Sequence, residues 1–154
     1  MLESGNKAPN FVLPSTINEK ISLSDLKGKP VILVFYPADN TPVCSSQLSL
    51  YNEIKSQGLF DNYNAELLGI SVDNLEKHQD FSRDLDLSYP LLADNNPEGE
   101  VTKKYGIFDE KNKTSQRALF VIDPQGIISW SYLSPIGDNP GAEGILDALD
   151  SLNN

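Results

Sequence analysis

Continuous apolar runs alternate with segments of helical periodicity in the first half of the chain. Residues 31–36 and 66–72 are apolar runs rich in β-branched or aromatic side chains, which is typical of strands buried on both faces of a parallel sheet. Between them, residues 42–57 have the spacing of a helix, and Gly58 is placed to end it. The order strand, helix, strand predicts a βαβ unit.

Two further helices are expected next. Residues 75–85 predict a helix with Asp73 as its N-cap, and a short extended segment follows at 89–92. Residues 96–98, with the sequence Asn-Pro-Glu, provide a cap residue, a proline for the first helical position and an acid for the first turn. A short helix is therefore expected from this point up to Gly106.

The two ends of the chain predict hairpins and a last helix. Apolar segments at 118–122 and 127–132 are joined by Asp-Pro-Gln-Gly, whose proline and glycine suit a tight reversal between antiparallel strands. Residues 142–152 predict a closing helix. Near the start, residues 11–13 and 20–23 flank a polar turn and predict a small hairpin.

These elements together predict an α/β protein with the thioredoxin fold. Its central mixed β-sheet would be flanked by helices, with a parallel βαβ half, an antiparallel ββα half and an N-terminal β-hairpin extension. The chain has 154 residues and contains no internal repeat, low-complexity tract or flexible linker. Residues 1–154 are therefore expected to form a single domain.

Composition narrows the functional classes. The chain has 22 acidic and 12 basic residues, a net charge of −10, and this balance argues against nucleic acid or an anionic membrane surface as a partner. No targeting segment or apolar run of membrane-spanning length is apparent, so a cytoplasmic protein is expected. One cysteine and one histidine cannot form an internal disulfide or a zinc site. We therefore expect no structural metal and no cofactor.

The single cysteine lies at an expected helix start. Thr41 has the side chain of an N-cap and Pro42 suits the first helical position, so that Cys44 falls within the first turn. Unpaired backbone N–H groups and the positive end of the helix dipole favour a thiolate at this position. Cys44 is therefore a candidate nucleophile.

Ionisation alone would not make this cysteine a catalyst. An ordinary cysteine is already about 5–10% thiolate near neutral pH, so full ionisation gains about tenfold, or about 1.4 kcal/mol. Enzymes lower barriers by at least about 8 kcal/mol, so fixed donors must hold the substrate. The candidate donors are the Thr41 hydroxyl, the N–H groups of Val43 and Cys44, and Arg117, which opens a strand. Arg83, the other arginine, is expected to be a surface charge on an acidic helix.

With these residues in place, the sequence resembles the peroxiredoxins, the alkyl hydroperoxide reductase and thiol-specific antioxidant (AhpC/TSA) family, over nearly the whole chain. The family motif Pro-x-x-x-Thr-x-x-Cys matches Pro37, Thr41 and Cys44, and its arginine before an Asp-Pro-x-Gly turn matches Arg117. Residues 36–44 resemble the bacterioferritin-comigratory or Q type. The later half of the chain, in residues such as 89–94 and 101–108, is more similar to the alkyl hydroperoxide reductase E type, so the subfamily stays open.

The resemblance implies an activity and a set of roles. The chain would reduce hydrogen peroxide or organic hydroperoxides, with Cys44 as the peroxidatic nucleophile that cycles through a sulfenic acid. Thr41 would hydrogen-bond the sulfur and the peroxide, Arg117 would orient both, and Pro37 would shield the sulfur from water. Supporting roles are expected for Val43, Gln47 and Tyr36. The family resemblance also implies a homodimer, with Phe108 at an apolar rim between subunits.

Two positions depart from the family pattern. Ser49 stands where many Q-type relatives carry a resolving cysteine. The Cys44 sulfenic acid would then need an external thiol reductant, such as a thioredoxin, a glutaredoxin-like protein or a small thiol. Gln47 stands where many relatives have a glutamate that braces the arginine, so Arg117 is expected to be held less firmly.

Several of these residues also allow other interpretations. The alternative function is a peroxide sensor that oxidises at Cys44 and relays the signal to a partner without efficient turnover. A disulfide oxidoreductase is rejected because Thr41 stands where the second cysteine would be needed. His78, on an acidic helix, is expected to be a surface or capping residue without chemistry. Trp130 is expected to be buried or at an interface edge, and Tyr36 either in the core or at the apolar rim.

Overall fold

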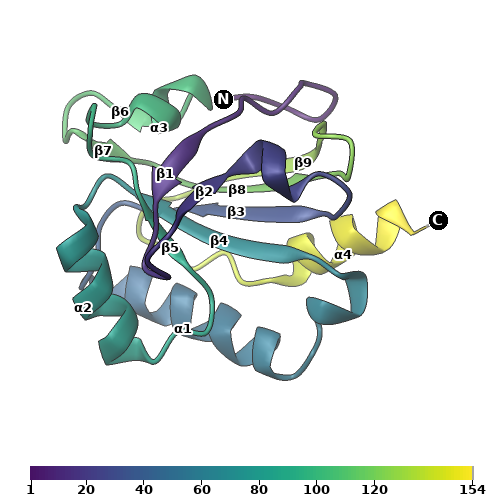
Figure 1. Cartoon of the computed structure of the whole chain (residues 1–154), viewed down its shortest axis with the longest axis horizontal. Coiled ribbons are helices and arrows are strands. Elements are labelled where there is room, and N and C mark those ends of the chain that lie inside the picture. The colour runs from purple at the N-terminus through teal and green to yellow at the C-terminus, as the bar shows by residue number, and fades with distance from the viewer. Residues whose placement is uncertain (154) are drawn as a thin grey trace.

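The computed structural model describes residues 1–153, and a five-stranded mixed sheet forms its centre (Figure 1). The strand order is β5-β4-β3-β8-β9, with β3, β4 and β5 parallel to one another and β8 antiparallel to both of its neighbours. The strands of this sheet are β3 (Val31–Phe35), β4 (Glu66–Ser71), β5 (Leu91–Ala93), β8 (Arg117–Ile122) and β9 (Ile128–Ser134).

Helices and hairpins complete the chain around this sheet. The helices are α1 (Pro42–Ser56), α2 (Leu75–Leu85), α3 (Glu100–Lys104) and α4 (Glu143–Leu152), with short 3-10 turns at Leu23–Leu26 and Asp61–Tyr63. One antiparallel hairpin pairs β1 (Val12–Pro14) with β2 (Lys20–Ser22), and another pairs β6 (Phe108–Asp109) with β7 (Thr114–Ser115). None of the helices within residues 1–153 has the length and apolar character required to span a bilayer.

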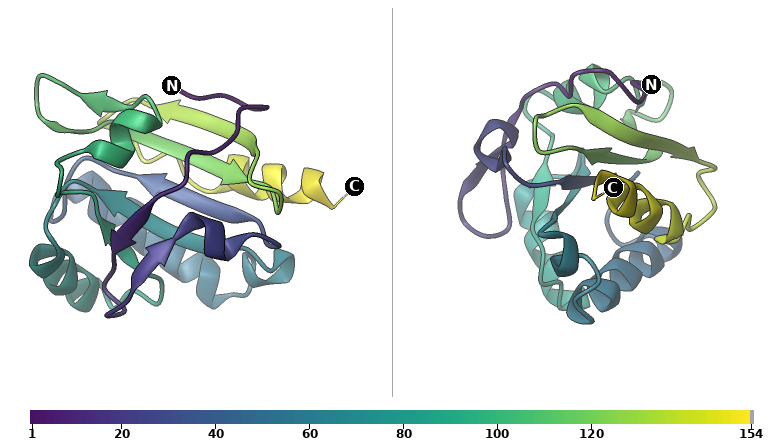
Figure 2. Two further views of the ribbon diagram at one scale, coloured as in Figure 1. Left: turned by 45° about the horizontal axis from the view of Figure 1, so that its top comes forward. Right: turned by 90° about the vertical axis from the view of Figure 1, so that its right-hand side faces the viewer.

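The sheet separates two hydrophobic clusters, because successive strand residues point to opposite faces. Ile32 and Val34 of β3 face a cluster that includes buried side chains of α1, α2 and α4. Val31, Leu33 and Phe35 face a second cluster built with the N-terminal segment, the β1–β2 hairpin and α3. Figure 2 shows the hairpin and helices α1 and α4 on opposite sides of the sheet. Burial on both faces explains why the β3 run is entirely apolar.

Most of the expected elements are confirmed. The βαβ unit is formed by β3, α1 and β4, and the antiparallel strands β8 and β9 precede α4 as expected. The N-terminal hairpin and the thioredoxin fold are also confirmed. Trp130 on β9 is half-buried, stacks on Tyr132 and packs against the cluster beneath α4. A β-carbon added to Gly144 would lie 2.6 Å from its ring, so this glycine permits a close approach of α4 to β9.

The expected bounds of α2 are confirmed, but its expected N-cap and the expected start of α3 are wrong. The N-cap of α2 is Asn74, not Asp73, because the Asn74 side chain accepts the Lys77 backbone N–H at 2.8 Å. Helix α3 begins at Glu100, later than the Asn-Pro-Glu sequence at 96–98 predicted.

Asp94 explains the late start of α3. Its carboxylate accepts the backbone N–H groups of Val101 and Thr102 at 3.1 and 2.8 Å and so caps the helix from outside the local sequence. Gly99, immediately before the helix, has a φ of +72°, in the left-handed region that glycine adopts at little cost. A distant carboxylate and a glycine thus set the start of the helix.

Candidate active site

Cys44 occupies the third position of α1, at the carboxyl end of β3. Pro42 is the first residue of the helix, and Thr41 is the N-cap residue with an extended backbone, φ −94° and ψ 150°. The Thr41 side chain makes no capping hydrogen bond to the helix; its hydroxyl donates to the Ala38 carbonyl at 3.3 Å. The predicted helix start is confirmed, and the threonine hydroxyl is not used by the helix.

Arg117 contacts the sulfur. The register of β3 with β8 pairs Phe35 with Ala118, so the first residue of β8 lies beside the point where the chain leaves β3 towards the cysteine. The Arg117 Nη1 lies 3.4 Å from Cys44 Sγ, although the two residues are 73 positions apart in the sequence. Arg83, by contrast, is an exposed surface charge paired with Asp80, as expected.

The guanidinium of Arg117 is held from two directions. Its Nη1 also donates to Gln47 Oε1 at 2.6 Å, while Nε and Nη2 both donate to the Ile136 carbonyl, at 3.1 and 2.9 Å. Arg117 is only 2% exposed, and a buried guanidinium with several fixed acceptors has little freedom to rotate. The neutral Gln47 thus braces the arginine geometrically, and its effect on activity stays a prediction.

Gln47 is itself oriented by a hydrogen-bonded chain. Its Nε2 donates to the Tyr51 hydroxyl at 3.1 Å, and that hydroxyl donates to the Gly141 carbonyl at 2.8 Å. Burial raises the pKa of Tyr51 to about 12, with a smaller opposing effect of the Gln47 hydrogen bond and the Arg117 charge. The tyrosine therefore stays protonated near neutral pH. This arrangement leaves the amide oxygen of Gln47 pointing towards Arg117.

Two electrostatic effects act on the Cys44 sulfur in opposite directions. Cys44 is fully buried and belongs to the hydrophobic cluster under α1 and α4, which disfavours a charged sulfur. The neighbouring guanidinium and the helix start favour one. The sulfur is therefore not surrounded by hydrocarbon alone, since a cation lies within hydrogen-bonding distance of it.

A surface hollow of about 680 Å³ adjoins the arginine. Arg117 both lines this hollow and contacts the buried sulfur, and so connects the surface with Cys44. Phe108, Leu133 and Ile136 contribute apolar side chains to the lining. Cys44 itself has no exposed surface, so the sulfur does not line the hollow.

The remaining predicted site residues lie at different depths. Pro37 and Val43 are half-buried beside the helix start, whereas Ser49 is exposed on α1. Tyr36 is fully buried, and its hydroxyl donates to Asp39 Oδ1 at 2.7 Å. Burial, with the neighbouring Asp39 charge, raises the pKa of Tyr36 well above its ordinary value. Tyr36 thus belongs to the core, the first of the two alternatives expected for it.

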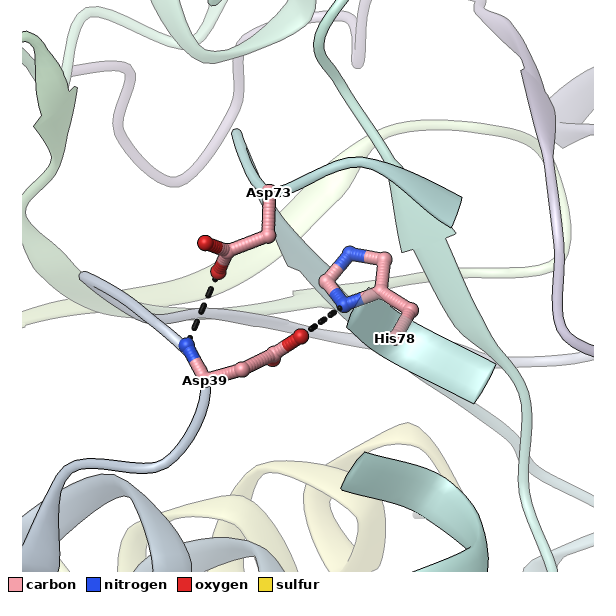
Figure 3. Close-up of side chains that lie close together, drawn as sticks. All are labelled: Asp39, Asp73 and His78. Carbon is pink, nitrogen blue, oxygen red and sulfur yellow. Dashed lines mark hydrogen bonds and ion pairs between the residues drawn. The ribbon is translucent and has the colours of Figure 1, made fainter. Parts of the chain in front are cut away.

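His78 is not at the surface, so the expectation from its acidic surroundings is wrong. Its side chain is fully buried, with Nδ1 2.7 Å from Asp39 Oδ2 and Nε2 3.0 Å from the Leu92 carbonyl oxygen. Figure 3 shows His78 next to Asp39, whose backbone N–H donates to Asp73 Oδ2 at 2.8 Å. Helical spacing could have found this: His78 lies three residues before the buried Phe81 and seven before Leu85, on one helical face.

These three side chains are also the group whose chemistry would suit a metal ion. Within the described part of the chain, the ligand atoms of Asp39, Asp73 and His78 lie within 4.8 Å of one another. The residues are hydrogen-bonded to one another or to the backbone, however, and both ring nitrogens of His78 already face oxygen atoms. A cation would have to displace these bonds, so the arrangement fits a hydrogen-bonded network better than a metal centre.

Comparison with protein families supports one assignment. The family model described as the AhpC/TSA family matches residues 4–131. A Coxiella burnetii protein named as a peroxiredoxin bcp is 40% identical over 134 residues, covering 83% of this chain and 86% of that protein. The peroxiredoxin of Thermoplasma volcanium is 32% identical over 154 residues, covering 96% of this chain and 73% of its own.

Solved structures agree with the sequence relatives. The peroxidoxin BcpB of Mycobacterium tuberculosis superposes with a TM-score of 0.88 at 27% identity, covering all of both chains. The AhpC of Enterococcus faecalis gives a TM-score of 0.89 at 26% identity, covering 99% of this chain and 93% of its own. The fold and the sequence thus point to the same group of proteins.

Proposed function

This chain belongs to the AhpC/TSA family of thiol-dependent peroxidases, the peroxiredoxins, and we propose that Cys44 is the residue with which it attacks the peroxide. The observation that carries this proposal is the Arg117 Nη1 lying 3.4 Å from Cys44 Sγ. Cys44 is the single cysteine of the sequence, and it lies at the start of a helix next to a fixed cation. These are the features that a thiolate nucleophile needs.

The proposed reaction is a two-electron transfer to the peroxide. The Cys44 thiolate attacks one peroxide oxygen, a sulfur–oxygen bond forms and the O–O bond breaks. The leaving oxygen takes up a proton and departs as water or an alcohol, while the sulfur becomes a sulfenic acid. Arg117 would stabilise the charge on the oxygens as the O–O bond stretches, because such fixed donors act mainly on the transition state.

Other residues would complete the site. The Thr41 hydroxyl, which is not used as a helix cap, would hydrogen-bond the peroxide, together with the backbone N–H groups at the start of α1. Gln47 would hold Arg117 in place, and Pro37 would shield the sulfur from water. The apolar lining of the hollow beside Arg117 would accommodate the organic part of an alkyl hydroperoxide, while hydrogen peroxide would need no such surface.

The cycle would be closed by an external thiol. Cys44 is the only cysteine among the 154 residues, which offer no second thiol. A first thiol would attack the sulfenic acid, releasing water and leaving a mixed disulfide, and a second thiol would release Cys44. A thioredoxin, a glutaredoxin-like protein or a small thiol would serve. A cytoplasmic location, where such thiols are kept reduced, is part of the proposal.

A second copy of the chain is the proposed structural partner. Leu133 and Ile136 are large apolar side chains at the end of β9 and in the loop after it, with 43% and 54% of their surface exposed, and both line the hollow beside Arg117. Clustered exposed apolar side chains are typical of interaction sites. We expect a homodimer in light scattering, and the double substitution L133D/I136D should give a monomer. A wild-type monomer at high concentration would contradict this proposal.

Turnover with added reductants tests the enzymatic proposal. Purified wild type and Cys44→Ser are mixed with excess peroxide and, in separate reactions, with a thioredoxin system, a glutaredoxin system or a small thiol. We expect sustained peroxide consumption by the wild type with at least one reductant and none by Cys44→Ser. The alternative, a sensor that relays oxidation to a partner, would oxidise once and then stop with every reductant. Family membership favours the enzyme.

A further inference from the structure

The loop that leads from β3 to Cys44 is anchored by a buried network on the far side from Arg117. Asp39 lies in this loop, two residues before Thr41, and is 3% exposed. Its Oδ1 accepts the Tyr36 hydroxyl at 2.7 Å, and its backbone N–H donates to Asp73 Oδ2 at 2.8 Å. Its Oδ2 faces the fully buried His78 Nδ1 at 2.7 Å (Figure 3).

The partners of Asp39 come from separate elements. Tyr36 follows β3, Asp73 follows β4 and His78 lies on α2, so three parts of the fold meet at one loop residue. Asp73 is held in turn by the Ser71 hydroxyl at 2.6 Å and the Lys77 Nζ at 3.0 Å. The loop is thereby tied to the framework of the domain by side chains rather than by the sheet.

Both ring nitrogens of His78 face acceptors. Nδ1 faces the Asp39 carboxylate and Nε2 faces the Leu92 carbonyl oxygen at 3.0 Å. Beside an ionised Asp39, a neutral imidazole with its one N–H satisfies only one of these contacts, whereas an imidazolium donates to both. Each contact is buried, where an unsatisfied polar group is costly. The geometry is therefore that of a ring with a proton on Nε2 and a second proton between Nδ1 and the Asp39 carboxylate.

The anchored loop needs such support. Asn40, immediately after Asp39, has a φ of +64°, a left-handed conformation that asparagine tolerates but does not prefer. The Thr41 hydroxyl turns back to the Ala38 carbonyl across the same tight segment. Without bonds on the Asp39 side chain, the Asp39 N–H bond to Asp73 and the half-buried Pro37 would be left to hold this backbone before Cys44.

We propose that His78, as a buried imidazolium paired with Asp39, is a positioning residue that holds the loop carrying Thr41 and Cys44 in its reactive arrangement. It touches neither the sulfur nor the peroxide and acts through Asp39. This inference rests on the proposed peroxidase function and deepens it. It assigns a role in the reaction to a side chain that the sequence pattern placed at the surface.

The charge state of the ring is directly measurable, because His78 is the only histidine of the chain. In protein labelled with ¹⁵N-histidine, one pair of ring signals is expected without any need for assignment by mutation. We expect both nitrogens of the reduced wild type to be protonated at neutral pH. In Asp39→Asn the ring should carry a single N–H. A wild-type ring with one unprotonated nitrogen would overturn the proposal, whatever the variants do.

Single-turnover oxidation of Cys44 by hydrogen peroxide tests the positioning role. We expect His78→Gln and Asp39→Asn to slow the reaction by about 10- to 100-fold, since small displacements of reacting groups cost this much. The double variant should be no slower than either single variant, because the two residues act as one unit. Oxidation of both single variants at the wild-type rate would overturn the proposal.

Asp94→Asn is the matched control. Asp94 is the other buried carboxylate of the described chain, 1% exposed, and it caps α3 instead of the loop before Cys44. Its replacement should lower stability while the rate of Cys44 oxidation stays within about threefold of wild type. A wild type that reacts no faster than a free thiol would instead refute the peroxidase function, so the two failures are distinguishable.

Discussion

At the scale of single residues, each of the three guanidinium nitrogens of Arg117 donates to a partner. The Ile136 carbonyl fixes Nε and Nη2, and Gln47 shares Nη1 with the sulfur. The Gln47 Oε1 in turn depends on Tyr51 for its orientation. Gln47 thus helps to set the direction of the Arg117 N–H groups that would bind the peroxide, without contacting the peroxide itself. This makes Gln47 a sensitive position for substitution.

Replacing Gln47 by methionine keeps its length and removes its oxygen. We expect the free energy of unfolding to fall by about 1–3 kcal/mol, because a buried guanidinium N–H and the Tyr51 hydroxyl lose a partner. Oxidation of Cys44 should slow by about tenfold as Arg117 gains freedom. Urea unfolding and single-turnover oxidation measure the two effects. Tyr51→Phe removes only the bond that orients Gln47 and keeps the Gln47 oxygen itself, so it should have the smaller effect on rate. The reverse order would contradict this interpretation.

Thr41 is the N-cap residue of α1, but its hydroxyl makes no capping hydrogen bond to the helix. Its hydroxyl bonds only the Ala38 carbonyl, at 3.3 Å, so Thr41→Val should change stability by less than about 1 kcal/mol. If the hydroxyl holds the peroxide, the same change should slow Cys44 oxidation by about 10- to 100-fold. Thr41→Ser, which keeps the oxygen, should remain close to wild type. Equal rates for the valine and serine variants would remove the hydroxyl from the mechanism.

At the scale of elements, the Cys44 sulfur and the Arg117 guanidinium are brought together by strand pairing. The parallel β3–β4 pair and the antiparallel β3–β8 pair leave the start of β8 beside the end of β3, where α1 begins. Buried apolar runs predict such strands from sequence because they must fill both faces of the sheet. Helix α1 is equally predictable, since Thr41 and Pro42 define its start and Gly58 its end.

Elements whose limits depend on distant contacts were not predictable. The β6–β7 hairpin has two residues in each strand, too few to show the alternation of apolar and polar residues that is typical of a strand. Helix α3 starts where the Asp94 carboxylate caps it, seven and eight residues away from the bonded N–H groups. The N-cap of α2 was misplaced by one residue, because Asp73 and Asn74 are both capable caps and Asp73 is used by the Asp39 loop instead.

The site was predictable to the extent that its residues carry local signals. Cys44 and Thr41 lie at a helix start, and Arg117 opens an apolar strand, so each has a pattern around it. His78 and Asp39 are 39 positions apart, and no sequence pattern around either residue indicates that the two side chains are in contact. Tertiary proximity of two polar residues within a core cannot be read from periodicity alone. The buried network was therefore missed.

At the scale of the whole molecule, tyrosines bridge the core with their hydroxyl groups. Tyr51, Tyr89 and Tyr105 are buried and donate to the carbonyls of Gly141, Leu48 and Pro9, respectively. Burial raises the pKa of each above its ordinary value, to about 12 for Tyr51. Tyr51 and Tyr89 belong to one hydrophobic cluster and Tyr105 to the other, so ionisation of these tyrosines would disturb the packing on both faces of the sheet.

Stability should therefore fall in strongly alkaline solution. The unfolded chain loses tyrosine protons near pH 10, whereas the folded chain retains them to higher pH. The tyrosine contribution is fully present below about pH 10 and is lost as the pH rises, by about 1.4 kcal/mol per pH unit for each buried tyrosine. Urea unfolding at increasing pH, followed with tyrosinate absorbance, checks this. Ionisation of the buried tyrosines near pH 10 without loss of structure would contradict it.

The most direct measurement for the molecule as a whole is the reaction of reduced protein with one equivalent of hydrogen peroxide. Stopped-flow kinetics give the rate, and mass spectrometry of the peptide containing Cys44 identifies the product. We expect oxidation several orders of magnitude faster than that of a free thiol, with one oxygen added at Cys44. Arg117→Lys should slow it by about 10²- to 10³-fold. A wild-type rate no faster than a free thiol's would contradict the assignment of Cys44 as the peroxidatic residue.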